Sequence, residues 1–303
     1  MEISQDHKIR KKEGYWSNLV EGETGIYKAE AIDELISQHF PDHCDAVLDV
    51  GCGTSVIAQT LRKRLGASRM VFMDYDPAVI EEMRKRVNDP TVEWKVGDIF
   101  NIGAWEDRFD LILLLDMIHE VYSFYGRPVR DVNVEIDHVR GQQAVYDALF
   151  QVARLVKLGG GIIITDNALS PERVPLRIRL RNAKVIKAVS KFLDEYPSRR
   201  IAVRWHADDE FSIDSHDFCI LLTQYNKIKA GNMDRWNVEK CEIHQYMTIA
   251  EYNNLFGHLG FTLYSLVGTP EGASEEWNED FKVIAGLSAI PEKRISLLAV
   301  KHR

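Results

Sequence analysis

Residues 47–54 read Val-Leu-Asp-Val-Gly-Cys-Gly-Thr, and this stretch decides the fold. Three apolar residues around one acid predict a buried strand. The two glycines cannot continue it, because glycine favours a tight turn that brings the backbone close to a ligand. Apolar residues at helical spacing over 55–65 then predict a helix, which Gly66 ends. Strand, glycine turn and helix in this order are typical of a nucleotide-type site at the end of a parallel strand.

The glycine turn favours one class of nucleotide-type ligand over another. Dinucleotide enzymes normally carry a third glycine, where this chain has Val56, and their fingerprint has no role for Asp49. The Asp-x-Gly-x-Gly pattern of Asp49, Gly51 and Gly53 instead resembles motif I of the class I S-adenosylmethionine (SAM) methyltransferases. The resemblance implies SAM as the cofactor, with these three residues at its amino-acid portion.

An acid also follows the next predicted strand, residues 69–73, and this order strengthens the resemblance. In the family, Asp74 would accept both ribose hydroxyls and Tyr75 would lie along the adenine. The alternative is a capped helix start, because Asp favours the N-cap and Pro the first turn. We expect Asp76 to be the cap and Asp74 to be the ribose ligand.

The third predicted strand, residues 92–96, is followed by Gly97 and Asp98. Asp98 resembles the family residue that accepts a hydrogen bond from the adenine amino group, and Ile99 would contact the ring. A turn aspartate is the alternative explanation. The fixed order of three such sites favours the cofactor role.

The rest of the core follows the same family pattern. The apolar run 109–115 predicts a strand buried on both faces, as in a parallel sheet covered by helices. A fifth strand is predicted over 162–166, and a capping box at Thr248 starts a helix that precedes two last strands. We therefore expect an α/β fold with a doubly wound, seven-stranded, mostly parallel sheet, an antiparallel C-terminal hairpin and helical cap insertions.

The resemblance covers about residues 44–166 and 246–302 and leaves segments that must choose the substrate. We expect four parts: a helical lid over 1–43, the SAM-binding core over 44–169, a helical cap over 170–245 and the C-terminal part of the sheet over 246–303. In the lid, Tyr15, Trp16 and Tyr27 are substrate-contact candidates, with ordinary packing as the alternative. The role of residues 268–294 stays open.

The segment after the fourth strand is expected to face the transferred methyl group. Asp116 is assigned to the cofactor, and Tyr122 and Tyr125 to the substrate. His119 is the candidate general base because its pKa lies near neutrality, although a packing role is the alternative. Glu120 is the candidate for holding a substrate amine or guanidinium.

The cap carries a basic segment and a second substrate candidate. Residues 171–204 contain ten Lys and Arg against three Asp and Glu, and apolar residues from Leu176 to Leu193 predict a helix there. This helix is a surface helix, a lid for an anionic group or an interfacial helix. Before the last helix, Glu242 and His244 lie in a stretch that can reach the substrate in relatives, and His244 is assigned to it.

Composition limits the function. The net charge is −8 and the pI about 5.7, which argues against a nucleic-acid partner. Four cysteines without a CxxC pair and a polar start without a signal peptide predict reduced thiols and a cytoplasmic protein. No run is long enough to span a membrane, and we expect no metal. The sequence leaves a homodimer open.

Three functions fit these residues. The first is a SAM-dependent methyltransferase that acts on O or N of a small molecule, which the aromatic inserted segments would enclose. The second is an RNA or protein methyltransferase that uses the basic residues 171–204. The third is a non-catalytic binding protein, against which the intact acids and glycines argue.

Overall fold

The computed structural model describes residues 23–40, 44–53, 56–87, 89–129 and 131–302. Its larger sheet has the strand order β3-β2-β1-β4-β5-β11-β9. Its first five strands run parallel, whereas β11 runs antiparallel to both β5 and β9. The strands are β1 (Ala46–Val50), β2 (Arg69–Asp74), β3 (Val92–Val96), β4 (Phe109–Leu115), β5 (Val156–Asn167), β9 (Phe261–Gly268) and β11 (Arg294–Lys301). The doubly wound sheet with its antiparallel hairpin is confirmed.

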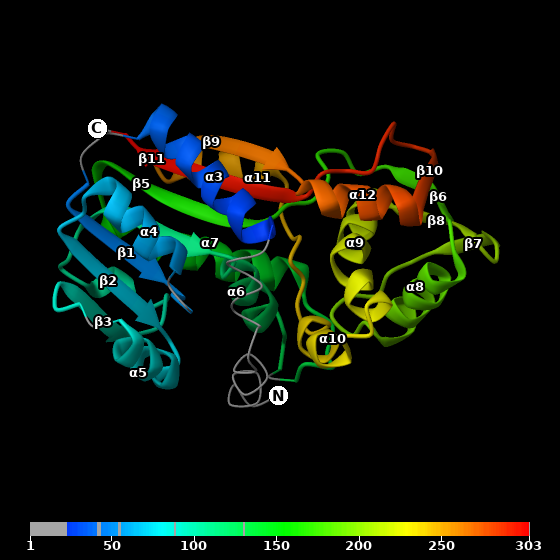
Figure 1. The fold of residues 1–303 in the computed structure, drawn as a ribbon, viewed down its shortest axis with the longest axis horizontal. Coiled ribbons are helices and arrows are strands. Elements are labelled where there is room, and N and C mark those ends of the chain that lie inside the picture. Colours follow the sequence, from blue (N-terminus) through cyan, green and yellow to red (C-terminus); the bar gives the residue numbers. More distant parts are fainter. Residues whose placement is uncertain (1–22, 41–43, 54–55, 88, 130, 303) are drawn as a thin grey trace.

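Helices cover both faces of this sheet (Figure 1). On one face α3 (Glu23–His39), α4 (Val56–Leu65) and α5 (Pro77–Arg86) share one apolar cluster with alternate strand residues such as Val47 and Leu113. On the other face α7 (His138–Leu155) and α11 (Ile249–His258) share a second apolar cluster with strand residues such as Leu48 and Leu114. Side chains alternate between the faces of a strand, so one apolar run fills both cores.

Local signals set the bounds of these helices. The side chain of Asp76 accepts from the backbone of Ala78 and caps α5, and Thr248 and Glu251 form the predicted capping box of α11. Gly66 takes a positive φ of 64° after α4. The segment after β4 begins with a short 8-residue helix, α6 (Ile118–Tyr125), and a 3-10 turn, η1 (Ile102–Ala104), precedes β4.

The cap has a second sheet, which the sequence analysis missed. Its strand order is β10-β6-β8-β7. The strands are β6 (Pro175–Leu180), β7 (Arg204–Ala207), β8 (Glu210–Asp214) and β10 (Phe281–Ala285). The prediction of a helix from Leu176 to Leu193 is therefore wrong at its start, because residues 175–180 form a strand and α8 begins only at Ala183. The cap is mixed α/β rather than helical.

The cap helices are α8 (Ala183–Glu195), α9 (Ser215–Lys229), α10 (Met233–Glu239) and α12 (Glu271–Asp280). Residues 268–294, whose role the sequence left open, supply α12 and β10 and so belong to the cap. Figure 1 shows the cap beside the end of the main sheet at which β4 and β5 finish. Among the described residues, no helix is long and apolar enough to cross a membrane.

Candidate functional site

A cavity of about 330 Å³ lies beyond the carboxyl ends of β1 to β4. Residues of the main sheet and of α6 form one side of it, and residues of the segment after α6 and of the cap form the other. On the core side it is lined by Val50, Gly51, Met73, Tyr75, Gly97, Asp98, Ile99, Met117, Glu120, Val121, Ser123, Phe124 and Tyr125. On the other side it is lined by Arg127, Val132, Val238, Cys241 and Glu242. This is where doubly wound sheets bind ligands.

The glycine turn presents its backbone to this cavity. Gly51 has a φ of 71° and Gly53 one of 46°, both in the left-handed region that favours glycine. The amides of Gly51 and Cys52 donate to the carbonyl of Met73 at 2.8 and 3.0 Å, which fixes the turn against β2. A Cβ at Gly51 would come 3.1 Å from Cβ of Met117, so the position suits glycine in space as well as in conformation.

Asp74 lies at the end of β2, directly beside the glycine turn. One carboxylate oxygen accepts from the amide of Asp76 at 3.0 Å and the other from the amide of Gly53 at 3.4 Å. The side chain is buried, and this burial raises the pKa of Asp74 to about 6 against the opposing effect of the two hydrogen bonds. The carboxylate is thus held in one orientation, with its charge easily lost in mild acid.

The predicted adenine residues come together in the cavity wall. Tyr75 is half-exposed and Ile99 is buried, and both line the cavity with Asp98. The amide of Phe100 donates to one oxygen of Asp98 at 3.0 Å, and the hydroxyl of Tyr125 donates to the other at 3.3 Å. Tyr125 therefore reaches the predicted cofactor end of the cavity.

Asp49 is the buried acid of β1, and it lies beneath the turn rather than in the cavity wall. Burial, and then the nearby charge of Asp74, raise its pKa to about 8. Between about pH 4 and pH 8 the folded protein therefore keeps a proton that the unfolded chain has lost. The contribution of Asp49 to the free energy of unfolding is therefore most favourable in acid, and it falls as the pH rises from about 4 to about 8.

We expect Asp49→Asn to remove this loss, because asparagine stays neutral at every pH. The ligand-free variant should melt at a higher temperature than the wild type at pH 8.5, with a smaller difference at pH 5. Thermal melts at the two pH values measure this. An equal difference at both would show that Asp49 is not the group responsible.

Asp116 is held by two cations instead of facing the cavity. It has a φ of 52°, which is unusual outside glycine, and pairs with Lys28 of α3 and, at 2.8 Å, with Arg294 of β11. Burial alone would raise the pKa of Asp116, but Lys28 and Arg294 hold it below its usual range. Lys28 is almost fully buried, so the triad fastens α3 across the ends of β4 and β11.

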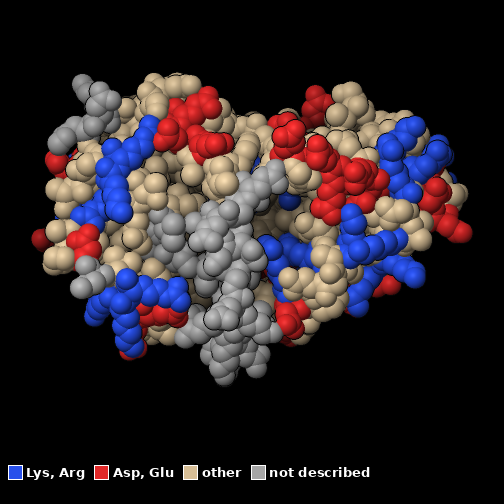
Figure 2. All heavy atoms as spheres, viewed as in Figure 1, with Lys and Arg blue, Asp and Glu red and all other residues tan. Residues whose placement is uncertain are grey.

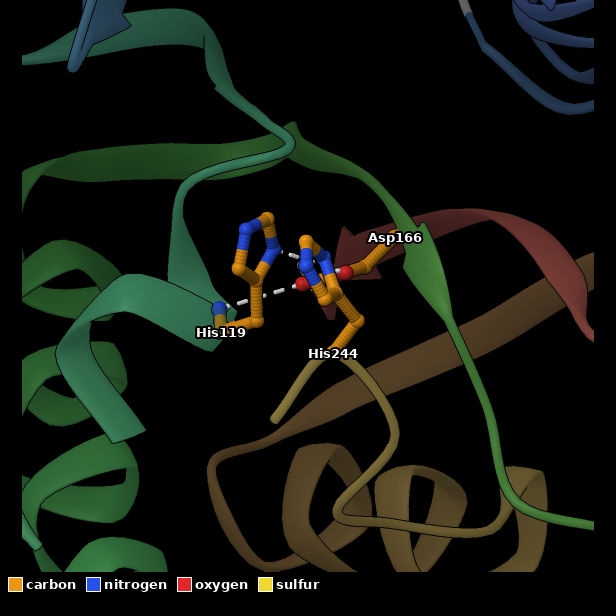
Figure 3. A group of neighbouring side chains, drawn as sticks. All are labelled: His119, Asp166 and His244. Atoms are coloured by element: carbon orange, nitrogen blue, oxygen red, sulfur yellow. Dashed lines mark hydrogen bonds and ion pairs between the residues drawn. The ribbon is translucent and has the colours of Figure 1, made fainter. Parts of the chain in front are cut away.

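His119 lies behind the cavity wall, bound to Asp166 at the end of β5 (Figure 3). Its Nδ1 lies 2.9 Å from one carboxylate oxygen of Asp166, and its backbone amide donates to the other at 3.1 Å. Burial opposes a charged ring, but Asp166, followed by Glu242 and Glu120, raises the pKa of His119 to about 9. At neutral pH a ring with this pKa is protonated on both nitrogens and has no lone pair to accept a proton. The structure therefore gives no support to the base role of His119.

His244 lies against His119 with the ring centroids 4.2 Å apart (Figure 3). Its Nε2 is 3.1 Å from the carboxylate of Glu239, which also pairs with Lys227 at 2.8 Å. Burial and the charge of His119 lower the pKa of His244 to about 3. His244 is therefore the neutral member of the pair, and it does not line the cavity.

In the described part of the chain, the side chains of His119, Asp166 and His244 are grouped closely enough to ligate a metal, with one donor atom of each within 4.8 Å of the others. Two observations favour a proton over a metal. A ligating histidine must be neutral, and the charge of Asp166 raises the pKa of His119, so a metal would have to displace a proton that this carboxylate stabilises. The oxygens of Asp166 already accept from Nδ1 of His119, from its amide and from the amide of Asn167 at 2.8 Å.

We therefore expect the purified protein to carry no stoichiometric zinc, nickel or cobalt, and chelation with EDTA to leave its melting temperature unchanged. Elemental analysis by mass spectrometry and a thermal melt measure the two. A stoichiometric metal whose removal lowers the melting temperature would contradict this account.

The remaining candidates for substrate contact do not lie in the cavity wall or fall outside the described residues. Tyr122 is not in the cavity wall, which corrects its substrate assignment: it is fully buried, stacks on Tyr246 at 4.6 Å and bonds His138 at 2.8 Å. Tyr27 of α3 packs against Gly268 at the end of β9, and it does not line the cavity. Tyr15 and Trp16 lie outside the described residues.

Two charged cavity residues had no assigned role in the sequence. Arg127 lies in the insertion after α6, and Glu242 lies in the stretch before α11 that can reach the substrate in relatives. The sequence pointed only to the stretch that contains Glu242, and not to Arg127 or Glu242 themselves. A single Arg or Glu in a polar loop forms no pattern that predicts a ligand contact. Arg127 and Glu242 line the same cavity because the cap packs against the segment after α6. Arg127 donates to the carbonyl of Cys241, which is 114 positions further along the chain.

Comparison with known proteins agrees with this geometry. Residues 47–125 match the family model described as a methyltransferase domain. The chain is 34% identical to ribosomal protein L11 methyltransferase of Thermotoga maritima over 100 residues, 32% of this chain and 37% of that protein. It is 24% identical to ribosomal RNA small subunit methyltransferase C of Haemophilus influenzae over 174 residues, 55% of this chain and 47% of that one. The chain thus spans less than half the length of these relatives.

A solved structure supports the fold of the whole chain. It is the N-methyltransferase NodS from Bradyrhizobium japonicum in complex with S-adenosylhomocysteine (SAH), with a TM-score of 0.51 at 10% identity, covering 98% of this chain and 97% of that one. At this identity the likeness concerns the fold alone. Residues 47–125 therefore match a methyltransferase-domain model, and the chain shares its fold with this solved structure.

Proposed function

We propose that this chain, which carries a methyltransferase domain over residues 47–125, is a SAM-dependent methyltransferase acting on O or N of a small molecule. One observation carries the proposal. Gly51 of the glycine turn, Tyr75, Asp98 and Ile99 line a single cavity, with the carboxylate of Asp74 held beside them. They are among the residues that the resemblance assigned to the cofactor, and they follow the ends of three different strands.

The residues present fit the cofactor. The backbone at Gly51, where a Cβ would crowd Met117, would hold the amino-acid portion. The oriented carboxylate of Asp74 would accept the ribose hydroxyls, and Asp98 the adenine amino group, with Tyr75 and Ile99 beside the ring. Asp116 would act indirectly, because Lys28 and Arg294 already hold it.

The cofactor would supply a methyl group on a positively charged sulfur, ready for in-line displacement by a lone pair. The protein's contribution is then to exclude water and to place the acceptor, and positioning of this kind contributes about 7–11 kcal/mol at best. The cavity suits this task, because cap residues such as Val238 and Cys241 face the core residues across it.

An RNA or protein substrate is the second candidate, and the basic segment 171–204 favours it. Figure 2 shows that Lys and Arg of the cap lie next to acidic atoms over α12. In β6, Arg177 and Arg179 both pair with Glu210, at 2.5 and 2.6 Å. The basic charge is thus partly compensated within the cap, which weakens this candidate.

The small-molecule and RNA candidates are distinguished by incubating the protein with SAM and either a metabolite extract or total RNA. We expect SAH release with the extract and a product one methyl group heavier by mass spectrometry. Release with RNA alone, together with RNA binding that weakens steeply with salt, would favour the second candidate.

A further inference from the structure

Two helices on the surface of the cap carry exposed charges of opposite sign. On α8, Lys184, Lys187 and Lys191 recur at intervals of three and four residues, so they lie on one face, which we call the basic stripe. Lys184 and Lys187 are exposed, and Lys191 is partly buried. On the other side of α8, Val185 and Val189 are fully buried in an apolar cluster. This helix therefore presents lysines to solvent while its apolar face is fixed in the cap.

On α12 the exposed charges are acidic. Glu271, Glu275 and Glu279 recur every four residues and are all exposed, and they form the acidic stripe. Trp277 and Asp280 are buried on the other side of this helix. Like α8, α12 is thus fixed by one face and presents charges of a single sign on the other.

Both stripes are electrostatically unfavourable within a single copy. Among the described residues, neither Lys184 nor Lys187 nor the acidic stripe makes an ion pair, whereas Lys191 pairs with Glu195 at 2.8 Å. Like charges three or four residues apart on a helix repel each other. Lys184 in the first turn of α8 and Glu279 in the last turn of α12 also oppose the helix dipoles. Opposite charges from another molecule would offset both effects.

The two stripes match each other in position and in length. Figure 2 shows acidic atoms over α12 and basic atoms around α8 on the same face of the molecule (compare Figure 1). With a rise of about 1.5 Å per residue, the basic stripe is about 10 Å long and the acidic stripe about 12 Å. A two-fold axis between the helices would place the acidic stripe of each copy on the basic stripe of the other, so that one contact is made twice.

We propose that two copies of this chain form a dimer through their caps, with the acidic stripe of each copy against the basic stripe of the other. Charge complementarity favours a second copy over RNA, because a polyanion on the basic stripe would be repelled by the acidic stripe beside it. The inference concerns a surface of the cap and is independent of the proposed function.

The dimer should be weak and sensitive to salt. An exposed ion pair contributes about 0.2–1 kcal/mol, and the interface holds two sets of such pairs. At 0.15 M salt the Debye length is about 8 Å, so the net charge of −8 on each copy is largely screened while ion pairs in contact persist. At 1 M salt the Debye length falls to about 3 Å, and the contact pairs weaken as well.

Sedimentation velocity of the full chain, over a range of protein concentrations up to submillimolar, measures the association. We expect a concentration-dependent dimer at 0.15 M salt and a monomer at 1 M. A monomer under both conditions, or a dimer that 1 M salt leaves intact, would overturn the inference.

Two charge-reversal variants locate the contact. Lys184→Glu with Lys187→Glu reverses the basic stripe, and Glu271→Lys with Glu275→Lys reverses the acidic stripe, so each variant alone should be monomeric. An equimolar mixture should form a 1:1 dimer, because each stripe then meets the opposite charge. Both variants keep a net negative charge, so a general attraction does not account for such a dimer. If the mixture stays monomeric while circular dichroism shows both variants folded, the inference is wrong.

A control variant separates the stripes from the net charge. Lys63→Glu with Lys85→Glu makes the same change of charge on exposed positions of α4 and α5, outside the cap. This variant should dimerise like the wild type. An equal loss of the dimer in this control and in Lys184→Glu with Lys187→Glu would show that net charge alone sets the association, which would contradict the proposed contact.

Discussion

We expect the Asp74→Asn variant to bind SAH about a hundredfold more weakly than the wild type, or worse. The carboxylate is buried beside the glycine turn, with both oxygens oriented by backbone amides. Two ribose hydroxyls donating to a charged group would each contribute about 1.5–3 kcal/mol. Asparagine keeps the size of the side chain but loses the charge, so the fold should persist while the affinity falls.

The pH dependence gives a second signature of Asp74. Because burial raises its pKa to about 6, the wild type should lose SAH affinity as the pH falls below 6 and the carboxylate takes up a proton. The Asn variant should lack this dependence. Calorimetry at pH 5, 6 and 7.5 measures both effects, with Asp147→Asn on the exposed side of α7 as the control. Wild-type affinity in Asp74→Asn would exclude this carboxylate from the site.

The second large effect concerns the triad of Lys28, Asp116 and Arg294, in which Lys28 is buried. Lys28→Met should lower the free energy of unfolding by about 3 kcal/mol, because removal of one partner of a buried pair leaves the other charge poorly compensated. The expected value lies at the lower end of the range for such pairs, since Asp116 keeps Arg294 and is 29% exposed.

Urea unfolding measures this effect, with Lys85→Met as the matched control. Lys85 pairs with Glu81 at 2.7 Å on the exposed surface of α5, and a pair of this kind contributes only about 0.3–0.5 kcal/mol. Adding Asp116→Asn to Lys28→Met should recover part of the loss. If the two lysine variants unfold alike, the triad does not fasten α3 to the sheet.

The core was predictable because its signals are local. A strand of the sheet is buried on both faces and reads as a continuous apolar run, as in Phe109–Leu115. The glycine turn, Asp74 and Asp98 each lie at the end of a parallel strand, and parallel strands bring their carboxyl ends to one edge. The cofactor side of the cavity could therefore be assembled from order along the chain alone.

The cap was not predictable in this way. Leu176, Ile178 and Leu180 point inward on β6, but 176 and 180 also fit helical spacing, and the prediction chose the helix. The strand is decided by its partners β8 and β10, which lie far along the chain. The same holds for the triad, whose members Asp116 and Arg294 are 178 residues apart.

On the substrate side of the cavity, the sequence could not predict which aromatic side chain faces the ligand. Tyr122 and Tyr125 are three residues apart on α6, yet one is buried in the core and the other lines the cavity. Which aromatic of a short helix faces a ligand depends on its rotation against α7 and the cap. Composition and spacing along the segment do not set this rotation.

Titration of the purified wild-type protein with SAH and, separately, with NAD tests the central claim most directly. The glycine turn and Asp74 predict saturable uptake of SAH and none of NAD. Heat of binding with NAD and none with SAH would contradict the account.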